Sequence, residues 1–376
     1  MKFLLIAGIA RSVVNFRGPL ITALQERGLE VHVAAPGLTV DSQFGCELKS
    51  RGVYIHSIPL QRTGINPISD VRAFIWLVRL MKMIRPEFSL GYTIKPVVYG
   101  ALAAAITGVP RRFALVTGLG YAFSATEESS DLKRSVVKKI VHFLYRRALL
   151  NCEKIFFQNP DDEALFRKLG LVDQSGVTRI VNGSGVDIDF FSVVPISGQV
   201  CFLLIARLLR DKGIMEYVEA ARIVRAKHPE VRFLLVGDLD ENPTSISSVE
   251  LGAWVKEGIV EYRGRLLDVR PAIAESSVYV LPSYREGTPR TVLEAMAMGR
   301  AIITTDAPGC RETVVNGENG LLVPVKAVDE LASAMLRFVK QPGLAKEMGD
   351  RGRALCEAKY DVHKVNKFML AELGLN

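Results

Sequence analysis

Short apolar runs alternate with helical patterns along the whole chain, and this alternation constrains the fold more than any other feature of the sequence. Such βαβ alternation predicts parallel sheets that are covered by helices on both faces. In the first half, the predicted strands are 2–7, 30–35, 53–58, 88–92, 112–116, 154–158 and 178–181, and the predicted helices are 17–27, 68–84, 97–107, 131–150 and 161–169.

The pattern restarts after a segment rich in turn formers, Asn182–Asp187. A chain of 376 residues is long enough for two hydrophobic cores. We therefore expect an α/β fold with two doubly wound, Rossmann-like domains, 1–187 and 188–359, facing a cleft that holds the ligand. In the second domain, the predicted strands are 200–206, 231–236, 260–262, 278–281 and 301–304, and the predicted helices are 214–227, 245–256, 269–275 and 289–298.

The five cysteines are widely spaced, which disfavours a disulfide framework or a CxxC metal site and favours a reducing compartment. The apolar runs 3–10 and 97–109 are too short to span a bilayer, which takes about 20 residues. We interpret the first run as a buried strand rather than a signal peptide. The sequence thus predicts a protein without a transmembrane segment.

The net charge of +8 lies entirely in the first half of the chain. Residues 1–190 contain 24 Lys and Arg against 16 Asp and Glu, whereas the remainder contains 24 of each. The helix 131–150 interleaves basic and apolar residues, so we expect it to lie on anionic lipid, with a solvated basic face as the alternative. The sequence shows no nucleic-acid-binding module. The basic residues of this helix are Lys133, Arg134, Lys138, Lys139, Arg146 and Arg147, and Lys154 follows it.

The loop and helix start that follow strand 278–281 form the strongest candidate site. Thr288 suits an N-cap, Pro289 the first helical position and Gly299 the helix end. The helix start favours a phosphate. Glu286 precedes the helix and Glu294 lies on its second turn, so we expect two separate carboxylates that accept hydrogen bonds from hydroxyl groups on either side of a diphosphate. On spacing alone, a loop charge and a surface helix residue are an equal alternative.

Two cations are predicted at the carboxyl end of strand 200–206. Arg207 follows the strand, and Lys212 with Gly213 opens the next helix. Both side chains could stabilise a departing diphosphate. Either cation alone could be a solvated surface residue, but the two together, beside a glycine at a helix start, favour a phosphate site.

These motifs, in this order, resemble the large family four of retaining glycosyltransferases, which has the GT-B fold. The resemblance covers nearly the whole chain and includes the segments 182–187 and 317–323, Arg207 with Lys212, and Glu286-x7-Glu294. The stretches 92–100, 116–123 and 236–243 are similar to the bacterial surface-polysaccharide and glycan-assembly subgroup, which includes the Campylobacter N-acetylgalactosaminyltransferase of N-glycan assembly.

The resemblance implies a role for each matching residue of the second domain. Arg207 and Lys212 would bind the donor diphosphate, and Glu286 would hold hydroxyls of the donor sugar. Glu294 would bind the ribose, and Arg265 lies where the family contacts uracil. The segment expected around the phosphates, with backbone N–H contacts from residues 288–291, is Gly287, Thr288, Pro289, Arg290 and Thr291.

In the first domain, the resemblance places the loop after the first strand near the acceptor and donor phosphates. Gly8 is expected to approach a phosphate closely, and the segment after residue 360 is expected to return to this domain. Lys95 is a candidate for an acceptor diphosphate, with an exposed loop lysine as the alternative. Thr117-Gly118 stands where many family members carry a histidine.

Asp238-Leu239-Asp240 spells the DxD that binds a metal–diphosphate in another glycosyltransferase fold. Because Arg207 and Lys212 already provide positive charge for the diphosphate, we expect no metal and no other cofactor.

The sequence therefore predicts a retaining hexosyltransferase that acts in surface-polysaccharide or glycan biosynthesis. Its expected donor is a UDP-sugar, and its expected acceptor is a saccharide linked to a polyprenyl diphosphate, at the inner face of the cell membrane. The alternatives are a sugar-nucleotide epimerase on the same fold and a membrane-bound sugar-nucleotide-binding scaffold without activity.

Overall fold

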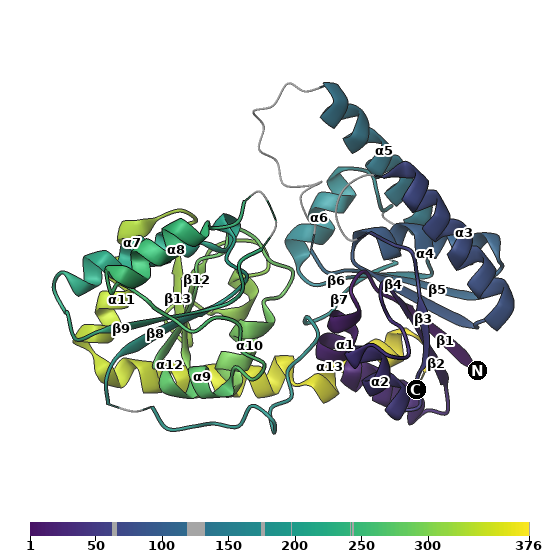
Figure 1. Cartoon of the computed structure of the whole chain (residues 1–376). Helices are drawn as coiled ribbons and strands as arrows, with labels where there is room; N and C mark the ends of the chain where they lie inside the picture. The colour runs from purple at the N-terminus through teal and green to yellow at the C-terminus, as the bar shows by residue number, and fades with distance from the viewer. Residues whose placement is uncertain are drawn as a thin grey trace. The chain divides into compact units, whose positions relative to one another are not determined.

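The computed structural model describes residues 1–61, 66–118, 132–173, 177–196, 198–240, 242 and 244–375, with the backbone alone for 132–138. The chain divides into two compact units (Figure 1). Unit 1 comprises Met1–Ser184 with Asn366–Asn376, and unit 2 comprises Gly185–Val365. The limits expected from the sequence, Asp187 and about Tyr360, differ from these divisions by a few residues.

Unit 1 is built on a parallel sheet in the order β3-β2-β1-β4-β5-β6-β7. Helices α3, α4, α5 and α6 cover one face, and α1, α2 and α13 cover the other (Figure 1). The strands are β1 (Lys2–Ile6), β2 (Glu30–Ala35), β3 (Tyr54–Ser57), β4 (Phe88–Tyr92), β5 (Arg111–Val116), β6 (Lys154–Phe157) and β7 (Thr178–Ile180). The helices are α1 (Ala10–Gln25), α2 (Gln43–Ser50), α3 (Pro67–Ile84), α4 (Ile94–Ile106), α5 (Leu132–Leu149), α6 (Pro160–Lys168) and α13 (Val362–Glu372), whose last turns belong to this unit.

The central strands of unit 1 are buried on both faces, as expected for a parallel sheet between two helix layers. Phe3 of β1 pairs in register with Phe88 of β4, and their rings stack. Near the end of the chain, Glu372 accepts hydrogen bonds from Lys154 and Arg179, which ties α13 to β6 and β7.

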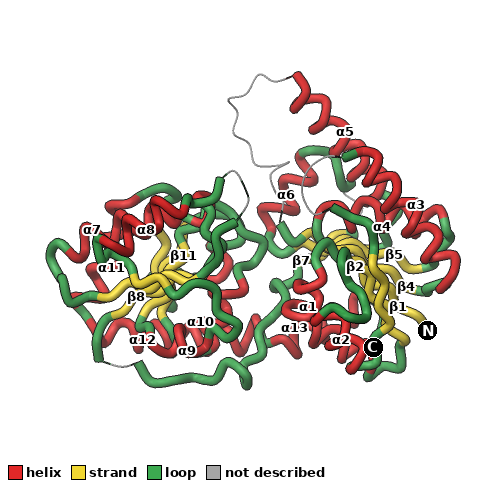
Figure 2. The backbone as a smooth tube through the Cα atoms, viewed as in Figure 1, coloured by secondary structure: helices red, strands yellow, loops and turns green. Residues whose placement is uncertain are grey.

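Unit 2 repeats the architecture, with a sheet between helices (Figure 2). Its strands are parallel and lie in the order β10-β9-β8-β11-β12-β13. Helices α7, α8 and α11 pack on one face, and α9 and α10 pack on the other. The strands are β8 (Cys201–Ile205), β9 (Arg232–Val236), β10 (Glu261–Tyr262), β11 (Val278–Leu281), β12 (Ala301–Thr305) and β13 (Gly320–Val323). The helices are α7 (Ile214–Arg225), α8 (Ser248–Lys256), α9 (Arg270–Glu275), α10 (Arg290–Ala297), α11 (Val328–Lys340) and α12 (Pro342–Leu355), with short turns η1 (Arg210–Lys212), η2 (Arg311–Thr313) and the π-helical η3 (Cys356–Tyr360).

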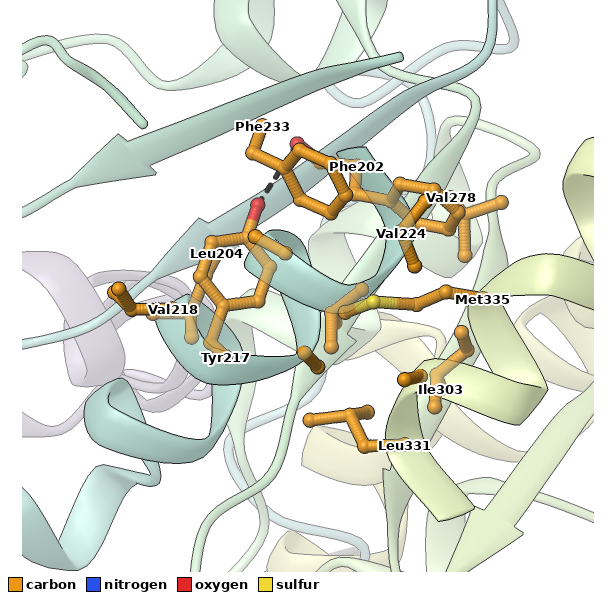
Figure 3. Close-up of a cluster of buried hydrophobic side chains, with 14 of the residues drawn as sticks. Phe202, Leu204, Tyr217, Val218, Val224, Phe233, Val278, Ile303, Leu331 and Met335 are labelled. Carbon is orange, nitrogen blue, oxygen red and sulfur yellow. Dashed lines mark hydrogen bonds between the residues drawn. The ribbon is translucent and has the colours of Figure 1, made fainter. Parts of the chain in front are cut away.

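The core of unit 2 joins α7 and α11 to the sheet (Figure 3). Phe202 and Phe233 stack on neighbouring strands, and Met335 of α11 is fully buried in the same cluster. Tyr217 brings a hydroxyl into this apolar layer, and the hydroxyl donates to the Phe202 carbonyl at 3.0 Å. Burial of each such side chain contributes about 1.5–3 kcal/mol, so this layer anchors the strands whose ends carry the site.

Several helix starts differ from the sequence-based prediction. Helix α1 begins at Ala10 rather than residue 17, because Gly18 and Pro19 hide a periodicity that includes the buried Ser12 and Val13. Helix α4 begins at Ile94 rather than residue 97. Helix α2 was not predicted, because its buried residues are too few to show a period. The sequence feature that could have indicated this helix is the N-cap residue Ser42, whose hydroxyl accepts a hydrogen bond from the Gly45 N–H.

Candidate active site

The candidate residues of unit 2 gather at one edge of its sheet. Arg207 follows β8, Arg265 follows β10 and Glu286 follows β11, and the strands they follow are parallel. Their carboxyl ends therefore lie at the same edge. Strand β8 lies between β9 and β11, so the strand order reverses here, at the position where doubly wound sheets bind ligands.

A close approach between two loops sets the geometry of this edge. Gly213 has a φ of 72°, and a Cβ at this position would overlap the carbonyl of Pro282, which follows β11. Next to this contact, the Tyr284 N–H donates to the Asp211 carbonyl at 2.9 Å. Only glycine combines this backbone conformation with so close an approach, so the end of η1 is held against the loop after β11.

Lys212 and Glu286 form an ion pair across this loop contact. The Lys212 Nζ lies 2.6 Å from Glu286 Oε1, and the two side chains are 15% and 18% exposed. From the sequence we assigned Lys212 to the diphosphate and Glu286 to the sugar, without expecting them to touch. The structure brings the two groups together, so sugar-binding and phosphate-binding functions would share one mostly buried, charge-assisted contact.

The loop after β12 holds the backbone of Glu286 from the opposite side. The Glu286 N–H donates to the Pro308 carbonyl at 2.9 Å. Gly309 has a φ of 81°, and a Cβ there would overlap the Glu286 carbonyl. This support was not predicted from the sequence, although the Pro308-Gly309 dipeptide is a turn signal.

Helix α10 starts one residue later than predicted. Pro289, rather than Thr288, is the N-cap, because the Pro289 carbonyl accepts the first helical hydrogen bonds, from the N–H groups of Val292 and Leu293. The assignments of Thr288 as N-cap and Pro289 as first helical residue are therefore wrong. Gly299 follows the helix end with a φ of 74°, the conformation expected of a terminating glycine.

Glu294 lies on the second turn of α10 and is paired within the helix. Its Oε1 lies 2.9 Å from Arg290 Nε. Burial raises the pKa of Glu294 above its ordinary value, and this exceeds the opposing effect of Arg290, while Asp268 also raises it. Additional hydrogen-bond donors would stabilise the ionised form of a carboxylate that burial destabilises.

The side chain of Thr291 points toward the strands rather than toward the carboxyl edge of the sheet. The Tyr279 hydroxyl lies 2.6 Å from Thr291 Oγ1 and also donates to the Ile205 carbonyl at 3.0 Å. This contact ties the first turn of α10 to β8 and β11. Any contact of Thr291 with a phosphate would therefore come from its backbone.

Two arginines at this edge are paired with the aspartates of the DxD segment. Arg207 Nη1 lies 2.9 Å from Asp240 Oδ2, and Arg265 Nε lies 3.6 Å from Asp238 Oδ2. Within the described ranges, no group of three or more His, Cys, Asp or Glu is arranged to hold a metal ion. Both aspartates of the segment therefore already have an arginine partner.

The candidates of unit 1 lie at the matching edge of its own sheet. Gly8 follows β1 and packs against Thr93, whose φ of 68° is unusual for a β-branched residue. Lys95 lies in the first turn of α4, and its Nζ is 2.7 Å from Asp70 Oδ1. The alternative of an exposed loop lysine is therefore wrong. Thr117 and Gly118 follow β5, and the rest of the similar stretch 116–123 lies outside the described residues.

Helices α3 and α5 flank α4 and expose apolar and basic residues together. In α3, the single acidic residue, Asp70, is buried, and α5 contains no acidic residue. The Arg147 guanidinium lies over the Phe143 ring. The side chains of Lys133, Arg134 and Lys138 lie outside the described residues. The described exposed residues are Ile68, Val71, Arg72, Ile75, Arg79, Lys82 and Met83 on α3 and Lys139, Ile140, Phe143, Arg146 and Arg147 on α5.

Comparison with family models gives two matches. A model described as "Glycosyl transferase 4-like" matches residues 4–159, and a model described as "Glycosyl transferases group 1" matches residues 199–341. The two matches fall in units 1 and 2 respectively.

Similar proteins are found among curated sequences and solved structures. The Campylobacter jejuni N,N'-diacetylbacillosaminyl-diphospho-undecaprenol alpha-1,3-N-acetylgalactosaminyltransferase is 30% identical over 335 residues, which cover 85% of each chain. The Escherichia coli UDP-Gal:alpha-D-GlcNAc-diphosphoundecaprenol alpha-1,3-galactosyltransferase is 25% identical, again over 85% of each chain. The Anabaena protein HepE, solved in complex with UDP, superposes with a TM-score of 0.76 at 18% identity over the full length of both chains, which shows a common fold.

Proposed function

Because the chain belongs to the GT-B glycosyltransferases of the group 1 and 4-like families, it is a glycosyltransferase, and we propose that it moves a hexose or N-acetylhexosamine from a UDP-sugar to a saccharide linked to a polyprenyl diphosphate. The Campylobacter and Escherichia relatives are named for undecaprenyl-diphosphate acceptors, and the second is named for UDP-Gal as well. The reaction would serve the synthesis of a bacterial surface polysaccharide or glycan.

The observation that carries this proposal is the Lys212–Glu286 pair at the point where the strand order of unit 2 reverses. The Glu286 carboxylate can accept hydrogen bonds from hydroxyls of the donor sugar. The Lys212 ammonium and the Arg207 guanidinium can neutralise the charge that develops on the departing diphosphate. The pair would therefore hold the two sides of the bond that breaks in one fixed arrangement.

We propose retention of configuration at the transferred sugar. Both relatives are named for alpha-1,3 products, and UDP-hexoses of this type carry the diphosphate in α linkage. An oxygen of the donor diphosphate would take the proton of the attacking acceptor hydroxyl, while Glu286 would orient the sugar. Most of the rate enhancement would then come from electrostatics and positioning.

The reaction would need no metal. The DxD segment that could hold one already contacts Arg207 and Arg265, so a divalent cation would have to displace both guanidinium groups. Lys212 and Arg207 supply the positive charge for which a metal–diphosphate site is otherwise required.

An anionic membrane surface would bind unit 1 through α3 and α5, which would bring the enzyme to its lipid-linked acceptor on the inner face of the cell membrane. Their exposed apolar residues can enter the interface while Arg and Lys contact lipid phosphates. Helix α3 was not expected in this role from the sequence. Among the helices that the structure describes, none is long and apolar enough to cross a membrane.

The test uses the purified full chain, a panel of UDP-hexoses and UDP-N-acetylhexosamines, and a short-chain polyprenyl-diphosphate saccharide as acceptor. The expected product, by mass spectrometry, is an acceptor extended by one sugar, with an α linkage by NMR and an undiminished rate in excess EDTA. An epimerised donor would identify an epimerase, and binding without turnover would identify a scaffold. A β-linked product would overturn retention, and a rate lost in EDTA and restored by magnesium would overturn metal independence.

A further inference from the structure

The Asp238-Leu239-Asp240 segment after β9 has no part in the reaction as described above. We propose that it positions arginines: Asp240 fixes the Arg207 guanidinium for the donor diphosphate, and Asp238 fixes Arg265 beside it. This inference rests on the proposed function of the unit 2 edge as the donor site. It assigns these carboxylates to orientation rather than to a metal ion.

The Asp240 side chain is fixed by its own loop. Its Oδ1 accepts from the Asn242 N–H at 2.9 Å, while its Oδ2 lies 2.9 Å from Arg207 Nη1. The Asp240 N–H in turn donates to Ser245 Oγ at 3.1 Å. The carboxylate is thus held by one hydrogen bond from its own loop, on a backbone that a second bond fixes, and it offers the arginine a defined partner.

The loop that carries Asp240 is joined to the loop that carries Arg207. The Leu208 N–H donates to the Asp238 carbonyl at 2.9 Å, and the Ile246 N–H donates to the Leu208 carbonyl at 2.8 Å. Gly237 packs so closely against the Ala206 carbonyl that a Cβ would overlap it. The backbones on both sides of the Arg207–Asp240 pair are therefore joined by direct contacts.

The Asp238–Arg265 pair extends this arrangement to the next strand. The Gly237 N–H donates to the Gly264 carbonyl at 2.9 Å, and the Tyr262 hydroxyl donates to the Gly237 carbonyl at 2.8 Å. These bonds join the end of β9 to the turn that precedes Arg265. The longer 3.6 Å separation of this ion pair makes it the weaker of the two.

The benefit of such positioning follows from the exposure of Arg207. Its side chain is 46% exposed, and holding such a long side chain in one rotamer costs conformational entropy. Asp240 orders the guanidinium before the donor arrives and engages Nη1, while the other N–H groups of the fork can bind phosphate oxygens. Substrate binding then needs less ordering of this side chain.

A double-mutant cycle tests the proposal. Donor KM and kcat are measured for the wild type, Arg207→Met, Asp240→Asn and the double variant, with and without EDTA. If Asp240 acts through Arg207, Asp240→Asn alone raises donor KM about tenfold, but it changes little when Arg207 is already Met. Asp240→Glu, which keeps the charge, restores part of the loss. Arg210→Met is the matched control, because Arg210 is 47% exposed and pairs with Glu250 instead.

Two results would overturn the inference: equal losses from Asp240→Asn in both backgrounds, or a magnesium requirement that Asp240→Asn alters. Absence of any transfer by the wild type would instead overturn the proposed function. Thermal unfolding and UDP titration calorimetry accompany each variant. If Asp240→Asn does not fold, the cycle of Asp238→Asn with Arg265→Met decides by the same comparison.

Discussion

The Lys212 ammonium and the Glu286 carboxylate lie 2.6 Å apart, although 74 residues separate them in the chain. Each comes from a loop that follows a central strand of unit 2, and Gly213 allows the two loops to meet. Both side chains are mostly buried, so the contact holds each group in a defined position. A donor sugar would therefore meet a carboxylate that is already oriented.

Replacing Glu286 by Gln should abolish most of the activity while the protein stays folded. The amide keeps the shape but loses the charge that orients the sugar hydroxyls and pairs with Lys212. We expect kcat to fall by about 10²–10³-fold, the range found when one preorganised electrostatic group is removed. Rates with a UDP-sugar and the lipid-linked acceptor, together with the melting temperature, provide the measurement.

Lys212→Met should reduce kcat to a similar extent, because a departing diphosphate would lose its nearest ammonium. Lys346→Met is the matched control, since Lys346 forms an exposed ion pair with Asp350 on α12 and should leave turnover unchanged. Wild-type turnover by Lys212→Met would contradict the role given to the pair.

Gly213→Ala should cost both stability and activity, whereas Gly258→Ala should cost stability alone. The two glycines have φ values of 72° and 69°, so alanine carries the same backbone strain of about 1–2 kcal/mol at either position. At Gly258 a Cβ meets nothing within 4 Å, but at Gly213 it overlaps the Pro282 carbonyl. Turnover at a temperature where both variants are folded separates the effects. Equal turnover would show that the loop contact does not position Lys212.

The sequence predicted the strands of both sheets except β13, and the residues at their carboxyl ends, because buried parallel strands leave strong apolar runs between turn formers. It did not predict which of those residues touch. The Lys212–Glu286 pair depends on the approach of Gly213 to Pro282, and the Arg207–Asp240 pair depends on a loop bonded to a neighbouring strand end. Such contacts arise between segments far apart in the chain and leave no local periodicity.

Helix starts were the other source of error, for a local reason. Thr288 and Pro289 both suit the first turn of a helix. The helix start is defined by the residue whose carbonyl accepts the first helical hydrogen bond, and this residue is Pro289. The paired lysine of unit 1 illustrates the same limit. Lys95 was predicted to lie in a loop, but α4 already begins at Ile94, and the Lys95 ammonium contacts the Asp70 carboxylate.

Serine substitutions on α3 should weaken binding to anionic vesicles. Ile68, Ile75 and Met83 are 69%, 43% and 71% exposed, and each would lose up to about 1.5–3 kcal/mol of interfacial burial. Co-sedimentation of the triple variant with vesicles of phosphatidylglycerol and phosphatidylcholine should fall more than tenfold. Val249→Ser, at an 81% exposed position on α8, is the control and should bind as the wild type. Unchanged binding of the triple variant would show that α3 does not contact the membrane.

Glu294→Gln should weaken donor binding without lowering the stability of the fold. If Glu294 accepts hydrogen bonds from the ribose, the amide loses charge-assisted bonds worth about 1.5–3 kcal/mol, so donor KM should rise by about 10–100-fold. Burial raises the pKa of Glu294, which means that ionisation of this group costs more in the folded protein than in the unfolded chain and lowers stability. The variant should therefore be at least as stable as the wild type at neutral pH.

The difference in stability between Glu294→Gln and the wild type should depend on pH. The folded pKa of Glu294 exceeds the ordinary value of 4.5, so the stability that its protonation contributes is fully present below 4.5 and is lost as the pH rises through the folded pKa. The stability advantage of Glu294→Gln should accordingly shrink on acidification, as the wild-type carboxyl becomes neutral. Over the same interval, donor KM should rise for the wild type relative to the variant, because only the carboxylate accepts both ribose bonds. Parallel pH profiles of KM would show that the charge of Glu294 takes no part in donor binding.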